Sequence, residues 1–405
     1  MNSTYFIELE EKHGAHNYHP LPVVISKAKG CEMWDVEGKK YYDFLSGYSA
    51  VNQGHCHPVI TEALVNQVSK LTLTSRAFYN DKLGEYEKYI TTLLGFDKML
   101  PMNTGAEAVE TGIKLARRWA YTKKGIPENK AKMIVCAENF HGRTSTIVSF
   151  STDPSAFSKF GPFMPGFEVI PFNDTNALRT KLQDKDVAAF LFEPIQGEAG
   201  IIIPDQGYLK EVRKLCTEAN VLMIADEIQT GLCRTGKMMA CDHENVKPDI
   251  LLLGKALSGG TIPISAVLAN DAVMLTIKPG EHGSTFGGNP LASVVAIAAL
   301  NVLIDEKMAE NAEQMGKLFR NRLTTIHSTH IKEVRGIGLM NAIEINHPNP
   351  NAAWKLCETC MQNGLLAKPT HGDKIRLTPP LTINEKQINE AAEIIDESLS
   401  VLESL

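Results

Sequence analysis

The chain has 405 residues, of which 43% are hydrophobic and 22% are charged, and its formal net charge is -6. This length predicts two or three domains, and the composition excludes small stapled, disordered, collagen-like and coiled-coil classes. The acidic balance argues against a general polyanion binder, so no nucleic-acid partner is expected.

The eight cysteines lie at irregular spacings, several of them inside apolar segments, which indicates reduced, intracellular thiols. The first residues, MNSTYFIELEEKHGAH, contain three glutamates and no apolar run of signal-peptide length. We therefore expect a cytoplasmic protein, although a cleaved mitochondrial presequence would not be visible here. The longest apolar stretch, from Leu291, is too short to span a bilayer, so no membrane partner is expected.

In chain order, an N-terminal segment (residues 1–48) is expected to precede a large domain (residues 49–297). From about Lys98 to Leu268, short apolar runs alternate with stretches of helical periodicity. The runs are MIVC, FEVI, AAFLF, VLMIAD, ILLLG and ISAVLA. This alternation predicts an α/β fold with a mostly parallel sheet covered by helices on both faces.

A smaller C-terminal domain (residues 298–405) is expected to follow. Asn289 and Pro290 supply a capping residue and a first-turn proline ahead of an apolar helix predicted over 291–304. Beyond it, helical patterns alternate with candidate strands in LMNAIEI and KIRLTPPL, which predicts an α+β domain.

Two of the apolar runs are followed by side chains suited to catalysis, a carboxylate and an amine. VLMIADEIQTG places Asp226 at the end of one run, and PDILLLGKALSGG places Lys255 after another. The carboxyl ends of parallel strands share one rim, where ligands bind, so the carboxylate and the amine should converge. Pyridoxal phosphate would explain the pair, because it needs a lysine for its aldehyde and a carboxylate to keep its pyridine nitrogen protonated. The alternative is a helix-capping Asp226 and a solvated Lys255.

Two further segments offer phosphate-binding groups. TGAE (residues 104–107) has capping-box spacing ahead of an amphipathic helix, and Gly105 and Ala106 are small enough to let a phosphate approach the first-turn amides. The alternative is an ordinary capped helix. In GEHGSTFGGNP, the hydroxyls of Ser284 and Thr285 can bind phosphate, although a surface turn is the plainer interpretation.

Two patterns suggest metal or redox chemistry but favour simpler interpretations. His55-Cys56-His57 resembles a metal cluster, yet adjacent residues cannot all point at one ion, so packing in a turn is expected. Cys357-x-x-Cys360 lies in a helical pattern, where a redox role would require a strand-to-helix context, so cysteines on a helix face are expected. No metal site is predicted.

Several motifs of the sequence resemble those of a known enzyme family. ADEIQTG, with a lysine 29 residues after its aspartate, resembles the signature of the class III aminotransferases, pyridoxal-phosphate enzymes of fold type I. Within this family the chain is most similar to the ornithine aminotransferases. That similarity extends from His13 nearly to the C-terminus and rests on AHNYHPLPV, WDVEGKKYYDFLSGYSAVNQGHCHP, FGPFMPGF, EPIQGEAG, GKALSGG, IKPGEHGST and NGLLAKPTHGD.

The resemblance implies roles for individual residues and a homodimer with shared active sites. For the cofactor it implies ring stacking by Phe140, a contact of Gln229 with the phenolic oxygen, and phosphate binding by Gly105, Ala106 and, from the neighbouring subunit, Thr285 with Ser284.

For the substrate the resemblance implies Arg143 at the ornithine α-carboxylate, Tyr18 and Tyr48 lining the pocket, and Glu198 paired with Arg376. Arginine suits carboxylates because its donors match them in pairs. His141, beside Phe140, either shapes the pocket or simply packs.

The implied activity is transfer of the δ-amino group of L-ornithine to 2-oxoglutarate, giving glutamate and a semialdehyde that cyclises to pyrroline-5-carboxylate. One rival is another class III ω-aminotransferase, acting on acetylornithine or 4-aminobutyrate. A rival of a different kind is a catalytically silent, cofactor-binding dimer that serves as an interaction protein, against which the intact Lys255, Asp226 and Arg376 argue.

Overall fold

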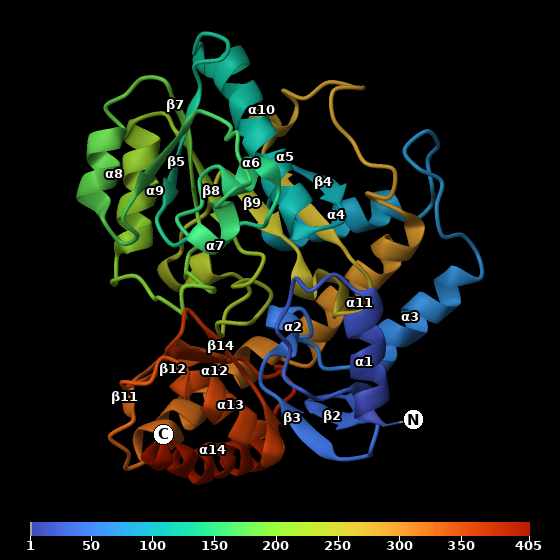
Figure 1. Ribbon diagram of the computed structural model, residues 1–405. Helices are drawn as coiled ribbons and strands as arrows, with labels where there is room; N and C mark the ends of the chain where they lie inside the picture. Colours follow the sequence, from blue (N-terminus) through green and yellow to red (C-terminus); the bar gives the residue numbers. More distant parts are fainter. Residues whose placement is uncertain (1) are drawn as a thin grey trace.

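The computed structural model describes residues 2–405 and is built around a seven-stranded sheet (Figure 1). Its strands lie in the order β4 (Lys98–Met102), β10 (Ser265–Ala269), β9 (Ile250–Leu253), β8 (Leu222–Asp226), β7 (Val187–Phe192), β5 (Lys132–Cys136) and β6 (Phe167–Ile170). From β9 to β6 all neighbours are parallel, whereas β10 is antiparallel to both β4 and β9. Each of the six predicted apolar runs forms a strand, and the mostly parallel sheet is confirmed.

Alternate residues of the central strands enter two separate cores. Met133 and Val135 of β5 pack in the core that includes α5 (Gly105–Trp119). Ile134 and Cys136 pack on the opposite face, where α8 (Thr175–Lys181) and α9 (Tyr208–Glu218) lie. Because both faces are covered by helices, every position along the strand is apolar, which is the physical origin of the continuous runs seen in the sequence.

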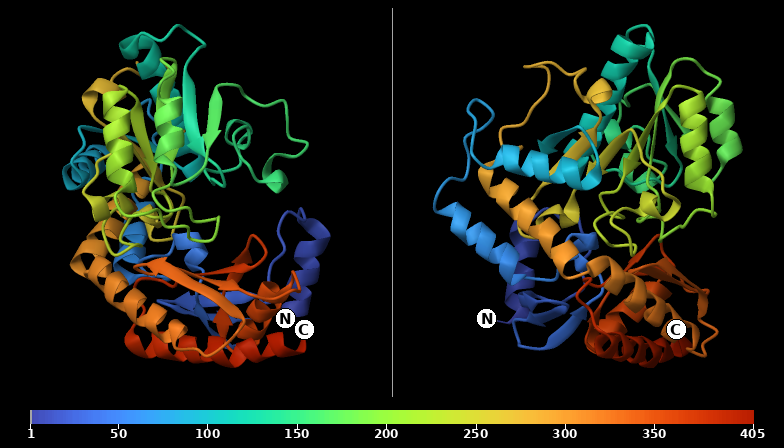
Figure 2. Two further views of the ribbon diagram at one scale, coloured as in Figure 1. Left: turned by 90° about the vertical axis from the view of Figure 1, so that its left-hand side faces the viewer. Right: turned by 180° about the vertical axis from the view of Figure 1, so that it is seen from behind.

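The long helix α11 (Pro290–Asp305) connects the large domain to the C-terminal part. Its start is as predicted, with Pro290 in the first turn and the Asn289 side chain accepting the Ala292 N–H at 2.8 Å. α11 packs against α3 (Pro58–Val68) and α4 (Leu83–Leu94), and α12 (Met308–Thr324) continues the chain into the C-terminal region (Figure 2).

The C-terminal region is α+β, as predicted. Its antiparallel sheet has the order β11 (Ile331–Ile337), β12 (Met340–Ile345), β15 (Lys374–Leu377) and β14 (Lys368–Thr370). The helices α12, α13 (Ala352–Gln362) and α14 (Glu385–Leu399) pack around this sheet. In Figure 2 the sheet lies below the large domain, with α14 along the outer side.

The N-terminal segment forms a third sheet with a strand from the far end of the chain. β1 (Ile25–Lys29), β2 (Glu32–Asp35) and β3 (Lys40–Asp43) form an antiparallel sheet, and β13 (Leu365–Leu366) adds to β3 in parallel. The segment is thereby attached to the C-terminal region. The division into residues 1–48, 49–297 and 298–405 stays a prediction, and Met1 lies outside the described residues.

The remaining elements are short connections or surface helices. They are α1 (Ser3–His13), α2 (Ser46–Ser49), α6 (Ser145–Val148), α7 (Pro154–Phe157), α10 (Asp271–Met274), η1 (Ala120–Lys124), η2 (Ala240–Glu244), η3 (Lys255–Ser258) and η4 (Ser400–Ser404). Within residues 2–405, no helix combines the length and the apolar character needed to cross a membrane.

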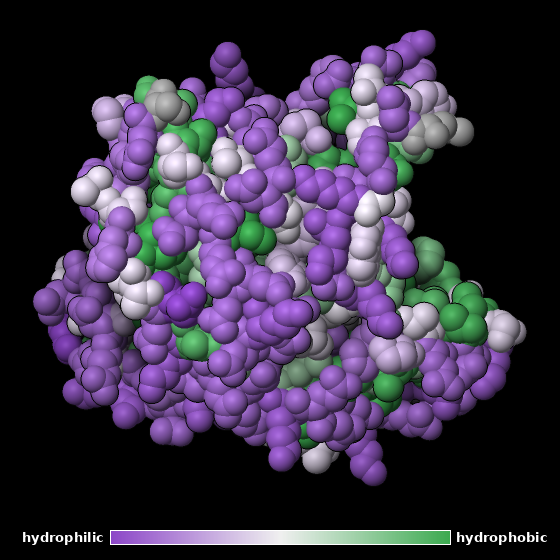
Figure 3. Space-filling model, turned by 90° about the horizontal axis from the view of Figure 1, so that it is seen from below, coloured by the Kyte–Doolittle hydropathy of each residue, from purple (hydrophilic) through white to green (hydrophobic). Residues whose placement is uncertain are grey.

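Exposed apolar side chains gather on α3 and the loop that follows it. They are Val59, Val65, Val68, Leu71 and Phe78, the last 73% exposed. Seen from below, the surface is mostly hydrophilic, but hydrophobic surface appears at the right-hand margin, the side on which α3 lies in Figure 1 (Figure 3). Such a group of exposed apolar residues is typical of an interaction face.

Candidate active site

The two residues predicted to share a rim do so in the structure. Asp226 ends β8, and Lys255 begins η3 two residues beyond the end of the neighbouring parallel strand β9. Both line one cavity. The other predicted residues that line it are Gly105, Ala106, Phe140, Glu198 and Gln229. The fold therefore brings together residues from distant parts of the chain at the carboxyl ends of the strands.

Lys255 sits in an environment that favours its neutral form. Burial lowers the pKa of its amine, and the negative charges of Glu198 and Asp226 only partly oppose this effect. A neutral amine is the form that attacks a carbonyl carbon. The backbone of Lys255 is left-handed, with φ 43°, a conformation that is costly for a residue with a side chain and is typical of constrained functional sites.

Asp226 is held by His141, the residue whose role the sequence left open. Asp226 is only 5% exposed, its Oδ2 lies 2.6 Å from His141 Nδ1, and its Oδ1 accepts the Ile228 N–H at 3.1 Å. Burial lowers the pKa of His141, but the hydrogen bond and charge of Asp226 outweigh burial and raise it. His141 thus fixes the orientation of the carboxylate, in addition to packing beside it.

Glu193 is a site residue that the sequence interpretation missed. It follows the last residue of β7, and its carboxylate accepts the backbone N–H of Phe140 at 3.0 Å and that of Gly197 at 3.2 Å. Burial raises its pKa to about 7. The signal was available, because Glu193 follows the run AAFLF much as Asp226 ends VLMIAD.

The N-terminus of α5 lines the same cavity as Asp226, through Gly105 and Ala106. The predicted capping box is confirmed: the Thr104 hydroxyl accepts the Glu107 N–H, and the Glu107 carboxylate accepts the Thr104 N–H. The amides of the first helical turn have no partner within a helix. A side chain on Gly105 would place its Cβ 3.1 Å from Ile228 Cδ1, so glycine leaves more room at this helix start than a larger residue would. Together these features form a cradle suited to a phosphate.

Glu198 and Arg376 form an ion pair, as the resemblance implied. Arg376, on β15, is 4% exposed, and its guanidinium carbon lies 5.1 Å from the centroid of the Tyr48 ring. Burial alone would raise the pKa of Glu198, but Arg376 and Lys255 lower it below its ordinary value. The Gln229 amide also contacts Glu198, at 3.4 Å. The pair joins the large domain to the C-terminal sheet at the edge of the cavity.

Of the five predicted substrate residues, only Glu198 lines the cavity; the four that do not are Tyr18, Tyr48, Arg143 and Arg376. Tyr18 is 72% exposed, and the amine of Lys368 lies 6.0 Å from the centroid of its ring. Arg143 is exposed, with its guanidinium carbon 5.7 Å from the centroid of the Phe140 ring. Arg143 therefore stands beside the lining residue Phe140, whereas the contact of Tyr18 is with a residue outside the lining.

The predicted hydroxyl pair is not brought to the cavity within one chain. Ser284 accepts a hydrogen bond from the Asn103 side chain at 2.8 Å and another from the Gly287 N–H at 3.0 Å. Thr285 is exposed, and the next residue, Phe286, is 57% exposed. The loop therefore presents Thr285 and Phe286 to solvent, whereas Ser284 is half-buried and bonded within the chain.

The simpler interpretations of the two cysteine patterns are supported by the structure. The rings of His55 and His57 contact different carboxylates, 2.7 Å from Asp43 and 2.9 Å from Glu306. The C-x-x-C motif lies in α13, with both sulfurs buried. Among residues 2–405 no group of three or more histidine, cysteine or acidic side chains could hold a metal ion.

Nearly the whole chain is similar to known aminotransferases. The family model described as aminotransferase class-III matches residues 13–399. A relative from Rattus norvegicus, named ornithine aminotransferase, mitochondrial, is 62% identical over 98% of this chain and 91% of its own length.

Two solved structures are similar over nearly their full lengths. One is the Toxoplasma gondii ornithine aminotransferase whose title reports partial occupancy of PLP at the active site; it has a TM-score of 0.97, 49% identity, and coverage of 100% of this chain and 95% of that one. The other is titled acetylornithine aminotransferase from Elizabethkingia anophelis, with a TM-score of 0.92, 62% identity and 99% coverage of both chains.

Proposed function

The chain belongs to the class III aminotransferases, and from this premise we propose that it transfers the δ-amino group of L-ornithine to 2-oxoglutarate. The products are glutamate and glutamate-5-semialdehyde, which cyclises to pyrroline-5-carboxylate. The observation that carries the proposal is the Glu198–Arg376 pair beside Lys255. The pair places a carboxylate-binding cation, Arg376, beside a carboxylate, Glu198, that can mask it. An enzyme that accepts ornithine in one half-reaction and glutamate in the other requires such a cation.

The residues present fit pyridoxal phosphate as the cofactor. The buried Oε1 of Gln229 and Nε2 of His141 have no partner among the described residues, so the cavity holds polar atoms ready for a ligand. We assign the phosphate to the α5 amides at Gly105 and Ala106, and the phenolic oxygen to Gln229. Phe140 would lie against the ring, and Asp226 would pair with the pyridine nitrogen. When bound, the cofactor supplies an aldehyde for amines and a ring that withdraws electrons from the reacting carbon.

Proton movement is assigned to Lys255. Its lowered pKa favours the neutral amine, which would take a proton from the substrate carbon and would then pass that proton to the cofactor. Asp226 would keep the pyridine nitrogen protonated, and His141 keeps Asp226 in place through the 2.6 Å contact. Two residues at the same edge of the sheet thus divide the work: Asp226 would hold the cofactor ring, and Lys255 would carry the proton.

Selection between the two substrates is assigned to the Glu198–Arg376 pair. With ornithine bound, Glu198 masks Arg376, so the α-carboxylate goes to Arg143 and the δ-amine reaches the reaction centre. With glutamate, the pair opens and Arg376 binds the α-carboxylate beside the reacting carbon. The exchange is feasible because one charge-assisted carboxylate pair replaces another. Tyr48, beside Arg376, and Tyr18 are assigned to the substrate pocket as part of this proposal.

A homodimer with shared sites is part of the proposal. Its support is the exposed Thr285 and Phe286 in a loop turned away from this chain's own cavity, and the apolar face on α3. Thr285 of the partner subunit, with Ser284 of the partner subunit beside it, would complete the phosphate site. The small-molecule partners are L-ornithine, 2-oxoglutarate and glutamate. A cytoplasmic location also remains a proposal, and the name of the rat relative makes the mitochondrion the alternative.

A second candidate function is acetylornithine transamination, favoured by the 62% identity to the Elizabethkingia protein. Initial rates with 2-oxoglutarate and equal concentrations of ornithine, N-acetylornithine and 4-aminobutyrate separate the candidates. The proposal expects ornithine to be the best donor and its product to be the cyclised semialdehyde. A higher kcat/KM for N-acetylornithine would favour the second candidate, and no turnover with any donor would favour a silent binding protein.

A further inference from the structure

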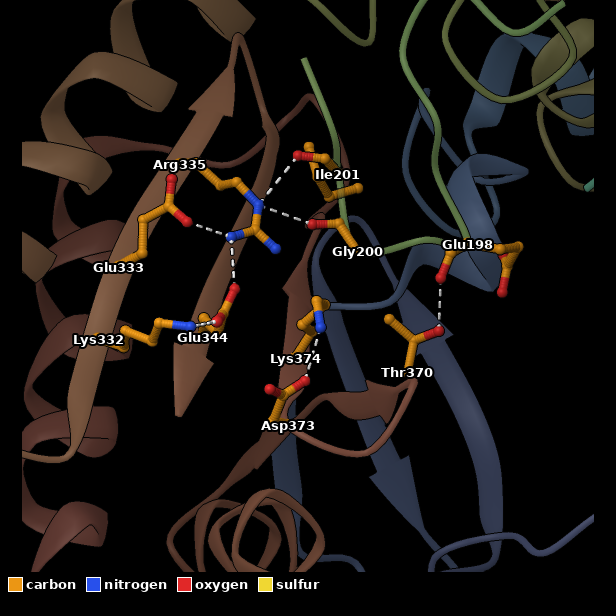
Figure 4. Close-up of polar contacts among 10 residues, drawn as sticks. All are labelled: Glu198, Gly200, Ile201, Lys332, Glu333, Arg335, Glu344, Thr370, Asp373 and Lys374. Carbon is orange, nitrogen blue, oxygen red and sulfur yellow. Dashed lines mark hydrogen bonds and ion pairs between the residues drawn. The ribbon is translucent and has the colours of Figure 1, made fainter. Parts of the chain in front are cut away.

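Glu198 is carried by a loop whose backbone is fixed by the other domain. The loop follows β7 and is closed at its base by paired backbone hydrogen bonds between Gln196 and Ile202, at 3.1 and 3.0 Å. Residues 196–202 are called the gate loop below. Its base belongs to the large domain, whereas its tip, with Glu198, lies against the C-terminal sheet (Figure 4).

Two side chains of that sheet bind backbone carbonyls at the tip. The Thr370 hydroxyl, at the end of β14, donates to the carbonyl of Glu198 at 2.7 Å. Arg335 Nε, on β11, donates to the carbonyls of Gly200 at 3.0 Å and Ile201 at 3.1 Å. Figure 4 shows both side chains reaching the gate loop from the C-terminal sheet. These contacts fix the backbone at Glu198 itself and at the residues that follow it.

Arg335 is itself held in a defined orientation. Its Nη1 lies 2.5 Å from a carboxylate oxygen of Glu333 and 3.0 Å from one of Glu344, and Glu344 also pairs with Lys332. The Arg335 side chain is only 12% exposed. The two acids take one end of the guanidinium and leave Nε directed at the loop, which a planar, preorganised group allows.

Packing reinforces these hydrogen bonds. The buried side chain of Ile201 lies in a small apolar cluster with Met340 and Ala342 of β12. A Cβ on Gly200 would come within 2.4 Å of Lys374 Cδ, so the loop backbone lies directly on β15. All four strands of the C-terminal sheet therefore contribute to holding one loop.

We propose that Thr370 and Arg335 are positioning residues for substrate selection: by fixing the gate loop they hold Glu198 in register with Arg376 and keep the ion pair closed. This inference rests on the proposed function. Arg376 is fixed on β15, so closure depends on where the loop places the Glu198 carboxylate. If the anchors weaken, the paired state loses stability, Arg376 is exposed more often, and dicarboxylates bind more readily at the expense of δ-selectivity.

The test compares Thr370→Val, which removes the hydroxyl at similar volume, with Thr370→Ser, which keeps it. Binding of glutarate, a dicarboxylate without an amine, is measured by calorimetry on the cofactor-loaded protein. Loss of one hydrogen bond that favours the closed pair should tighten glutarate binding roughly three- to tenfold in Thr370→Val and leave Thr370→Ser near wild type. In single turnovers, the ratio of glutamate to ornithine half-reaction rates should rise by a similar factor.

Arg335→Lys is the second variant, because it keeps the charge beside Glu333 and Glu344 but loses Nε. It should change both readouts in the same direction as Thr370→Val. Lys332→Gln is the matched control, since it alters the outer side of the same network without touching the loop, and it should behave as wild type.

A double-mutant cycle shows whether Thr370 acts through Glu198. Thr370→Val should have no further effect on glutarate binding in a Glu198→Ala background, where no gate remains to be positioned. The inference is overturned if Thr370→Val folds and matches wild type in both readouts, or if its effect is the same with and without Glu198. Failure of wild-type protein to convert ornithine would instead overturn the proposed function, so the two failures are distinguishable.

Discussion

The rim that carries Asp226 and Lys255 and the gate formed by Glu198 and Arg376 are built in different ways. The rim belongs to one sheet, where adjacent parallel strands β8 and β9 fix both side chains. The gate joins two sheets, because Glu198 follows β7 of the large domain and Arg376 lies on β15. A rigid rim suits chemistry that is the same in both half-reactions, whereas a gate between domains can have two states. Substitutions at the rim should therefore stop the reaction, and substitutions at the gate should redirect it.

The largest effect is expected for Lys255→Ala. Removing the amine deletes both the group that engages the cofactor aldehyde and the proton carrier, so each half-reaction should slow on the order of 10⁴-fold. Stopped-flow rates with ornithine and with glutamate measure this loss. Thermal unfolding should show a folded protein, and Lys210→Ala, an exposed lysine on α9, controls for loss of a surface charge. Wild-type rates would remove Lys255 from the mechanism.

Asp226→Asn should come next, with a loss of roughly 10²- to 10³-fold in both half-reactions. The substitution keeps the side-chain volume but loses the charge that holds the pyridine proton. Exchange of deuterium from the labelled substrate carbon into water reports the proton-transfer step itself, and it should slow by the same factor for both substrates. If exchange slowed for one substrate only, Asp226 would belong with the gate rather than the rim.

The same difference explains what could be predicted from the sequence. Asp226 and Lys255 were predictable because each follows an apolar run, and parallel strands place their carboxyl ends together. The capping box at Thr104 was predictable because its contacts are local. The gate was available only through the family resemblance, since no local pattern places Glu198 beside Arg376. Thr370 and Arg335 went unnoticed because each binds a backbone carbonyl about 135 or more residues away along the chain, which leaves no mark in composition or spacing.

Glu198→Ala should redirect the reaction with a smaller change in total rate. Without the carboxylate, Arg376 is permanently available, so the glutamate half-reaction should be preserved or faster. Ornithine should then also bind in the inverted pose with its α-amine at the reaction centre, lowering δ-selectivity roughly tenfold or more. Single-turnover product analysis distinguishes the two amines. Unchanged δ-selectivity, together with wild-type treatment of glutamate, would mean that dual specificity arises elsewhere.

The smallest effect is expected for Glu193→Gln, which probes the point where the two regions meet, since Glu193 accepts the N–H of Phe140 beside the rim and of Gly197 in the gate loop. Burial raises its pKa from 4.5 to about 7, so the folded protein binds more protons than the unfolded chain between these values. This contribution to stability is present below pH 4.5 and is lost as pH rises through 7. Glutamine does not titrate.

The free energy of unfolding of Glu193→Gln, taken relative to wild type, should therefore increase by about 1–3 kcal/mol between pH 4.5 and pH 8. Urea unfolding across this range measures the difference, and Glu128→Gln, in an exposed loop, controls for loss of an acid at the surface. A flat difference would show that Glu193 is ionised throughout, held by the two amides despite its burial. In that case the Glu193 carboxylate that connects Phe140 to the gate loop would stay charged across this pH range. Opening of the Glu198–Arg376 pair should then show no pH dependence arising from Glu193.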